Sequence, residues 1–216
     1  VLIAESEAPY HERKVTLLNG PHTVLSPVSY LSGINIVRDA LHHPVVGKYI
    51  KKVQYDELMQ TLNLPMAELQ QFAADVLERF DNPYVDHAVT SIMLNSFPKY
   101  QTRDLPGVKV YLERKGELPK GLVLGLAAII TYYKGGTRAD GAPIQPDDDP
   151  KVMVLLTNLW ATGDTRKVAE GVLGAADLIW KDHGNLNEIP GMTDMVTDFL
   201  NQIQAKGMLE TVKGIL

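Results

Sequence analysis

Apolar residues along this chain recur mostly at spacings of three and four, and strict two-residue alternation over five or more positions is hard to find. Spacings of three and four place apolar side chains on one face of a helix. The pattern therefore predicts an all-α protein. The expected helices cover residues 12–32 (stopped by Gly33), 36–41, 44–62, 65–80, 83–96, 119–134 and 150–162, followed by three or four shorter helices up to Leu216.

Proline and glycine define several of these boundaries. Pro44 and Pro65 suit the first turn of a helix, where a missing N–H costs nothing. Asp81 or Asn82 is expected to cap the helix that begins at Pro83. In the apolar helix 119–134, Gly121 and Gly125 are four residues apart, which would let a second helix approach closely.

The longest expected loop is 135–149, which is rich in Gly, Pro and Asp. It is the only candidate boundary within the 216 residues, and a single helical domain spanning 1–216 is the preferred interpretation. The N-terminal residues 1–7 show no initiating Met and no secretory signal pattern. We interpret them as the cut end of a longer chain.

Composition excludes several classes of function. The formal net charge of −5, without a basic patch, argues against general binding to nucleic acid or to an anionic membrane. The longest apolar stretch, 121–133, is too short to span a bilayer, which takes about twenty residues. The absence of cysteine rules out disulfides and thiolate chemistry, and it fits a reducing cytoplasm.

The segment 12–22 carries the candidate chemistry, because it holds Lys14, Asn19 and His22 at the spacing Lys-x4-Asn-x2-His. On a regular helix these residues fall at roughly 0°, 140° and 80°, so all three can face one cleft. A structural explanation is also open: Lys14 reaches solvent while Asn19 and His22 satisfy backbone groups near Gly20 and Pro21.

This segment resembles the active-site motif of the polyol-specific long-chain dehydrogenases, a family that includes mannitol 2-dehydrogenase and the hexuronate reductases. The run Arg79-Phe80-Asp81-Asn82-Pro83 is similar to a second element of that family. The stretch from Leu94 through Lys99 and Arg103 to Pro106 looks most like the branch that reduces the keto-hexuronate tagaturonate. The resemblance covers essentially the whole chain.

The resemblance implies a C-terminal helical domain with the fold of the 6-phosphogluconate dehydrogenase C-terminal domain. It implies NAD-dependent, metal-independent interconversion of D-tagaturonate and D-altronate, with NAD held by an N-terminal Rossmann domain that this sequence lacks. Lys14 would be the acid–base. Asn19 would stabilise the developing alkoxide, and His22 would hold the carbonyl oxygen or an adjacent hydroxyl.

A sugar acid also needs a cation for its carboxylate, and the candidates are Lys99 and Arg103, whose spacing of four places them on one side of a helix. Solvated surface charges are the alternative interpretation of this pair. Fructuronate reductase and mannitol 2-dehydrogenase activities remain open within the family, as does a non-catalytic helical interaction or dimerisation module.

Other constellations are weaker candidates. His42 and His43 are adjacent, so a helix would point them apart, which disfavours a metal site. Acidic residues at 147–149 before Pro150 are expected from helix capping and the helix dipole. The glycines at 135–136 and at 171 and 174 lack the strand-then-helix context of a dinucleotide fingerprint.

Overall fold

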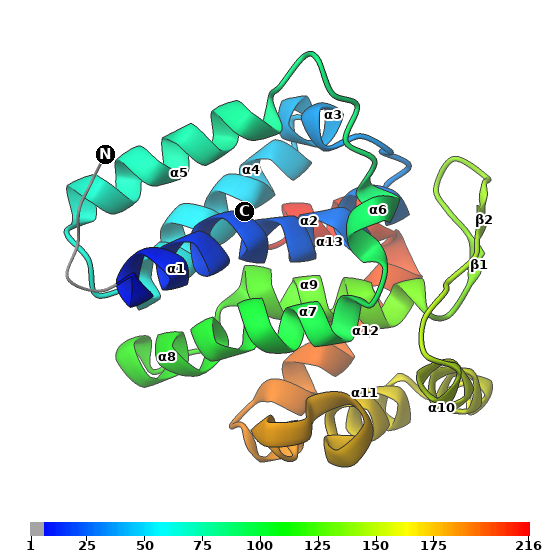
Figure 1. Ribbon diagram of the computed structural model, residues 1–216. Coiled ribbons are helices and arrows are strands. Elements are labelled where there is room, and N and C mark those ends of the chain that lie inside the picture. Colours follow the sequence, from blue (N-terminus) through cyan, green and yellow to red (C-terminus); the bar gives the residue numbers. More distant parts are fainter. Residues whose placement is uncertain (1–6) are drawn as a thin grey trace.

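The computed structural model describes residues 7–216 and shows a helical protein with one two-stranded hairpin (Figure 1). This confirms the all-α prediction. Residues 1–6, which include most of the interpreted cut end, lie outside the described residues.

In the N-terminal half, α5 packs against α3, η1 and η2 (Figure 1). The prediction of a helix over 12–32 is confirmed, although the helix begins earlier and is interrupted by a π-turn. Its end is set by Gly33, which has a φ of +83°. The elements, in which η marks π- and 3₁₀-helical turns, are α1 (Ala8–Lys14), η1 (Val15–Asn19), α2 (Gly20–Leu31), α3 (Val37–His42), α4 (Val46–Lys51), η2 (Lys52–Glu57), η3 (Leu58–Thr61), α5 (Met66–Phe80) and α6 (Val89–Met93).

The C-terminal half places α9 in the middle of the molecule, with α7 and α8 beside it and α10 and α11 at the far edge from α5 (Figure 1). The predicted helices 119–134 and 150–162 are confirmed to within two residues. The elements are α7 (Ser96–Arg103), α8 (Leu105–Lys115), α9 (Lys120–Tyr132), β1 (Gly136–Thr137), β2 (Pro143–Ile144), α10 (Pro150–Ala161), α11 (Thr165–Leu173), η4 (Ala176–Trp180), η5 (Lys181–His183), η6 (Leu186–Glu188), α12 (Met192–Lys206) and α13 (Met208–Lys213).

Close packing between α2 and α9 fixes the position of the candidate segment, as the two glycines predict. A Cβ at Gly125 would lie 2.4 Å from the Val24 side chain, and one at Gly121 would lie 2.8 Å from Val53. Both distances are shorter than side chains tolerate, so glycine is required where α9 passes α2 and η2.

The predicted helix over 83–96 is wrong in its first half. Residues 81–88 form an irregular loop, and the Asn82 carboxamide accepts a hydrogen bond from the Tyr84 N–H in a local turn instead of capping a helix. Tyr84 is 93% exposed, so this segment has no buried face that would favour a helix. The helix α6 then ends before Asn95, which adopts a left-handed conformation with a φ of 54°.

Three smaller boundaries also differ from the predictions. Pro44 lies in a turn before α4. The loop 135–149 contains the antiparallel pair β1–β2, with Gly136 opposite Ile144. The region after α10 contains the α-helices α11, α12 and α13, within the predicted three or four, but α12 with fifteen residues is longer than expected and the short turns η4, η5 and η6 were not predicted. The acidic run before Pro150 behaves as predicted, because the Asp149 carboxylate accepts from the Lys151 N–H at the start of α10.

No helix among residues 7–216 is long and apolar enough to cross a membrane.

Candidate functional site

The candidate segment passes through a π-turn. Within η1, the Gly20 N–H bonds to the Val15 carbonyl five residues earlier, so this turn holds one residue more than a regular helical turn. On a regular helix Lys14 and Asn19 would be about 140° apart. The extra residue in the turn narrows the angle around the helix axis between residues five apart, so it favours Lys14 and Asn19 facing the same side of the segment.

Two long-range contacts accompany the π-turn. The buried Gln54 amide donates to the Leu17 carbonyl at 2.9 Å, which gives a partner to a carbonyl within the turn. Gly20 packs against Asp104, and a Cβ on Gly20 would lie 3.0 Å from Asp104 Oδ1. Glycine at this position therefore lets the turn lie directly on the buried α7–α8 junction.

The three predicted residues have different surroundings. Lys14 ends α1 and is exposed, and it makes no hydrogen bond or ion pair with the described residues. The side chain of Asn19 is half-buried, and its backbone carbonyl accepts from the Thr23 hydroxyl at 2.9 Å. His22 is half-buried one turn further along, in α2.

His22 contacts two aromatic rings. Its imidazole stacks on Phe80 with ring centroids 3.9 Å apart, and it lies at an interplanar angle of 73° to the His87 ring, with centroids 5.4 Å apart. The Phe80 contact gives a structural role to the Arg79-Phe80-Asp81-Asn82-Pro83 element. Nε2 of His22 is buried and has no hydrogen-bond partner among the described residues.

The pKa of His22 follows from this environment. Burial, together with the neighbouring His87 and Arg103, lowers the pKa of His22 to about 3. The ring is therefore neutral at physiological pH, so one of its nitrogens can accept a hydrogen bond while the other donates.

Both predicted carboxylate-binding cations lie on α7 and are half-buried, so neither is a fully solvated surface charge. Lys99 Nζ donates to the Ile92 carbonyl at 2.6 Å. Arg103 Nη1 donates to the Thr23 hydroxyl at 3.3 Å, which brings the guanidinium beside the residue that follows His22. Burial lowers the pKa of both groups, and for Lys99 the nearby Arg103 lowers it further.

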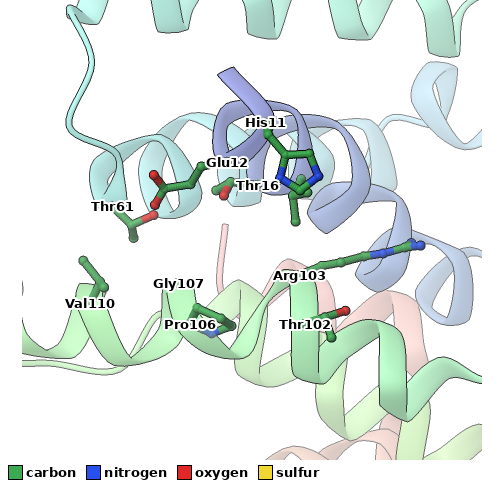
Figure 2. A pocket seen from close by; sticks show the side chains of 10 residues that line it. His11, Glu12, Thr16, Thr61, Thr102, Arg103, Pro106, Gly107 and Val110 are labelled. Carbon is green, nitrogen blue, oxygen red and sulfur yellow. The ribbon is translucent and has the colours of Figure 1, made fainter. Parts of the chain in front are cut away.

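A cavity of about 280 Å³ lies between α1–η1 and α7–α8, and Arg103 forms part of its wall with His11, Glu12 and Thr16 (Figure 2). Figure 2 shows the Arg103 side chain extending toward the blue ribbon of α2. Lys14, Asn19 and His22 are not among the lining residues of this cavity. The guanidinium thus belongs to the wall of the cavity and also bonds to Thr23, the residue that follows His22.

The weaker constellations have structural roles. His42 pairs with Asp81 at 2.8 Å, and His43 Nδ1 accepts from the N–H groups of Val45 and Val46. No group of three or more His, Cys, Asp or Glu side chains within 7–216 is arranged to hold a metal ion. Gly136 belongs to the hairpin.

Two contacts of the site were not predicted from the sequence. His87 meets His22 from a loop that was expected to be helical, and Thr23 receives the Arg103 hydrogen bond. The sequence offers no local signal for either, since the partners are more than sixty residues apart.

Comparison with known proteins places the chain in a family. Residues 8–204 match the model of the mannitol dehydrogenase C-terminal domain, and the chain belongs to this family.

The chain is similar to proteins described as altronate oxidoreductase. It is 76% identical over 216 residues to that of Phocaeicola vulgatus and 74% identical to that of Bacteroides thetaiotaomicron. In both comparisons all of this chain aligns, but it covers only 44% of the relative, so the chain spans less than half the length of these proteins.

The fold is also that of a solved enzyme. Mannitol 2-dehydrogenase of Pseudomonas fluorescens, determined as a ternary complex with NAD and D-mannitol, superimposes with a TM-score of 0.84. The match covers 98% of this chain and 42% of that enzyme at 19% sequence identity. This likeness confirms the predicted fold.

Proposed function

We propose that residues 1–216 form the helical substrate domain of an NAD-dependent oxidoreductase that interconverts D-tagaturonate and D-altronate in the cytoplasm. Its partner would be an N-terminal Rossmann-type domain of the same protein. The names of the 76% and 74% identical relatives support this choice of substrate.

The observation that carries the proposal is a group of basic side chains around α2 in a chain whose net charge is −5. Arg103 donates to the Thr23 hydroxyl next to His22. Lys99 lies close enough to Arg103 that the positive charge of Arg103 lowers the pKa of Lys99. Half-buried cations attract an anion more strongly than solvated ones, because they are less screened by water. A sugar acid offers the matching carboxylate, whereas an uncharged polyol does not.

In this proposal Lys14 donates a proton to the alkoxide oxygen as the ketone is reduced and removes it in the reverse direction. The Asn19 amide donates to the same oxygen and stabilises its developing charge, and the π-turn between Lys14 and Asn19 supports this pairing. Neutral His22 orients the carbonyl oxygen or an adjacent hydroxyl. Lys99 and Arg103 bind the carboxylate.

In this proposal the dinucleotide is bound outside the described residues. A pyrophosphate site of the Rossmann type needs a glycine-rich turn between a strand and a helix N-terminus. The only strands within 7–216 are the two short strands of the hairpin, β1 and β2. The nicotinamide, when bound by the remainder of the enzyme, supplies the hydride.

The test compares a keto-hexuronate with an uncharged ketose in the full-length enzyme, before and after Lys99→Met and Arg103→Met. Loss of a charge-assisted hydrogen bond of about 1.5 to 3 kcal/mol should lower kcat/KM for the acid by about tenfold or more. The ketose should be much less affected. Lys48→Met, on the exposed face of α4, is the matched control and should leave both values unchanged.

Equal losses for both substrates would show that these cations do not recognise the carboxylate. If the unmodified enzyme turns over fructuronate or mannitol faster than tagaturonate, that compound would replace tagaturonate as the proposed substrate. No turnover of any of these compounds would leave the chain as a helical interaction module.

A further inference from the structure

The loop 81–88, which brings His87 to His22, is irregular but firmly attached to the rest of the fold. On one side, Arg38 donates to the Asn82 carbonyl at 3.1 Å and forms an ion pair with Asp86 at 2.7 Å. A single arginine of α3 thus holds both the start and the end of the loop.

The other attachment is a β-bridge between Ile36 and Ala88. The Val37 N–H donates to the carbonyl of His87 itself at 3.0 Å. The backbone of His87 is therefore fixed by a hydrogen bond, although its side chain is exposed.

The imidazole of His22, in contrast, makes no hydrogen bond with the described residues, and Nε2 is buried without a partner. Only packing against its neighbours can set the orientation of such a ring. The two rings that contact it are Phe80, stacked at 3.9 Å, and His87, at 5.4 Å and an interplanar angle of 73°.

We propose that His87 is a positioning residue of this site, whose ring packs against the His22 imidazole and, together with the stacked Phe80, presents His22 to the substrate in one orientation. The proposal rests on the role proposed for His22 above. The loop attachments explain how an exposed side chain performs this task, because Arg38 and the β-bridge fix its backbone. His87 acts through His22 and need not touch the substrate.

The test uses three substitutions in the full-length enzyme: His87→Ala, His87→Phe and His87→Asn. Loss of one aromatic contact should raise the KM for the keto-hexuronate about three- to tenfold in His87→Ala, with little change in kcat. His87→Phe keeps a ring at the same place and should restore KM. His87→Asn keeps hydrogen-bonding capacity without a ring and should behave like the alanine variant.

Two further variants test the positioning logic. Arg38→Met loosens the loop and should raise KM in the same direction as His87→Ala, although Arg38 does not contact His22. His183→Phe is the matched control, since His183 lies in η5, where its backbone carbonyl accepts from Lys109 of α8. It should leave KM unchanged.

An unchanged KM in His87→Ala would overturn the inference, as would rescue by asparagine but not phenylalanine. A fall in kcat together with a lower melting temperature would overturn it as well, because it would indicate a merely structural residue. Lys14→Met is measured in the same series. If that variant is inactive while His87→Ala is normal, only the role of His87 fails, whereas full activity of Lys14→Met would refute the proposed function itself.

Discussion

Glu57→Gln should change how the stability of this chain depends on pH. Glu57 is 2% exposed, and its two carboxylate oxygens accept from the N–H groups of Gly121 at 2.7 Å and Leu122 at 2.8 Å. These N–H groups belong to the first turn of α9 and have no partner within the helix. Both bonds lower the pKa of Glu57, but burial has the larger effect and raises the pKa to about 7.

The direction of the pH effect follows from the two states of the chain. The reference pKa of this carboxyl is 4.5, so between about pH 4.5 and 7 the folded state holds a proton that the unfolded state has released. Stability therefore falls as the pH rises through this interval, and above about pH 7 the group contributes no further change. At about 1.4 kcal/mol per pKa unit, the loss is on the order of 3 kcal/mol.

Urea unfolding of the wild-type chain and Glu57→Gln between pH 4.5 and 8 measures this difference. At pH 4.5 the protonated wild-type carboxyl still offers its hydroxyl oxygen as an acceptor, where glutamine would turn an NH₂ donor toward a backbone N–H, so the variant should be less stable by about 1 to 3 kcal/mol. Its disadvantage should shrink or reverse by pH 7.5. Glu113→Gln, on the exposed side of α8, should keep the wild-type slope. Parallel slopes for wild type and Glu57→Gln would refute the assignment of this buried carboxyl.

Two further predictions concern the core beneath the site. Gly125→Ala should lower the free energy of unfolding by about 1 to 3 kcal/mol, because the added Cβ would lie 2.4 Å from Val24. This clash outweighs the higher helix propensity of alanine. A melting temperature equal to that of wild type would contradict the prediction. Asp104 is fully buried and burial holds its pKa well above 3.8, so wild-type stability should fall relative to Asp104→Asn as the pH rises above about 4. Unfolding curves at pH 5 and 8 check this, and a constant difference between the two proteins would count against it.

The sequence predicted the helices whose periodicity is long and regular, such as 65–80 and 119–134. It failed in the first half of 83–96, where a tertiary arrangement overrides the local pattern. The loop there is held by Arg38 and by the bridge to Ile36, and both attachments come from a segment more than forty residues earlier. A reading of local spacing cannot include such contacts.

The candidate site was likewise predictable from the sequence only in part. Lys14, Asn19 and His22 lie close together in the sequence, so a motif was enough to select them as candidates. Their relative orientation depends on the π-turn, which the regular-helix estimate did not include. The His87 contact joins residues far apart in the chain and required the fold.

The measurement that tests the account most directly is the kcat/KM of Lys14→Met in the full-length enzyme, with a keto-hexuronate and NADH as substrates. Removing a general acid from a positioned site should lower kcat/KM by about a hundredfold or more. Lys51→Met, an exposed lysine of α4, provides the control and should retain the wild-type value. A Lys14→Met enzyme within about threefold of wild type would contradict the central claim that Lys14 is the acid–base of this site.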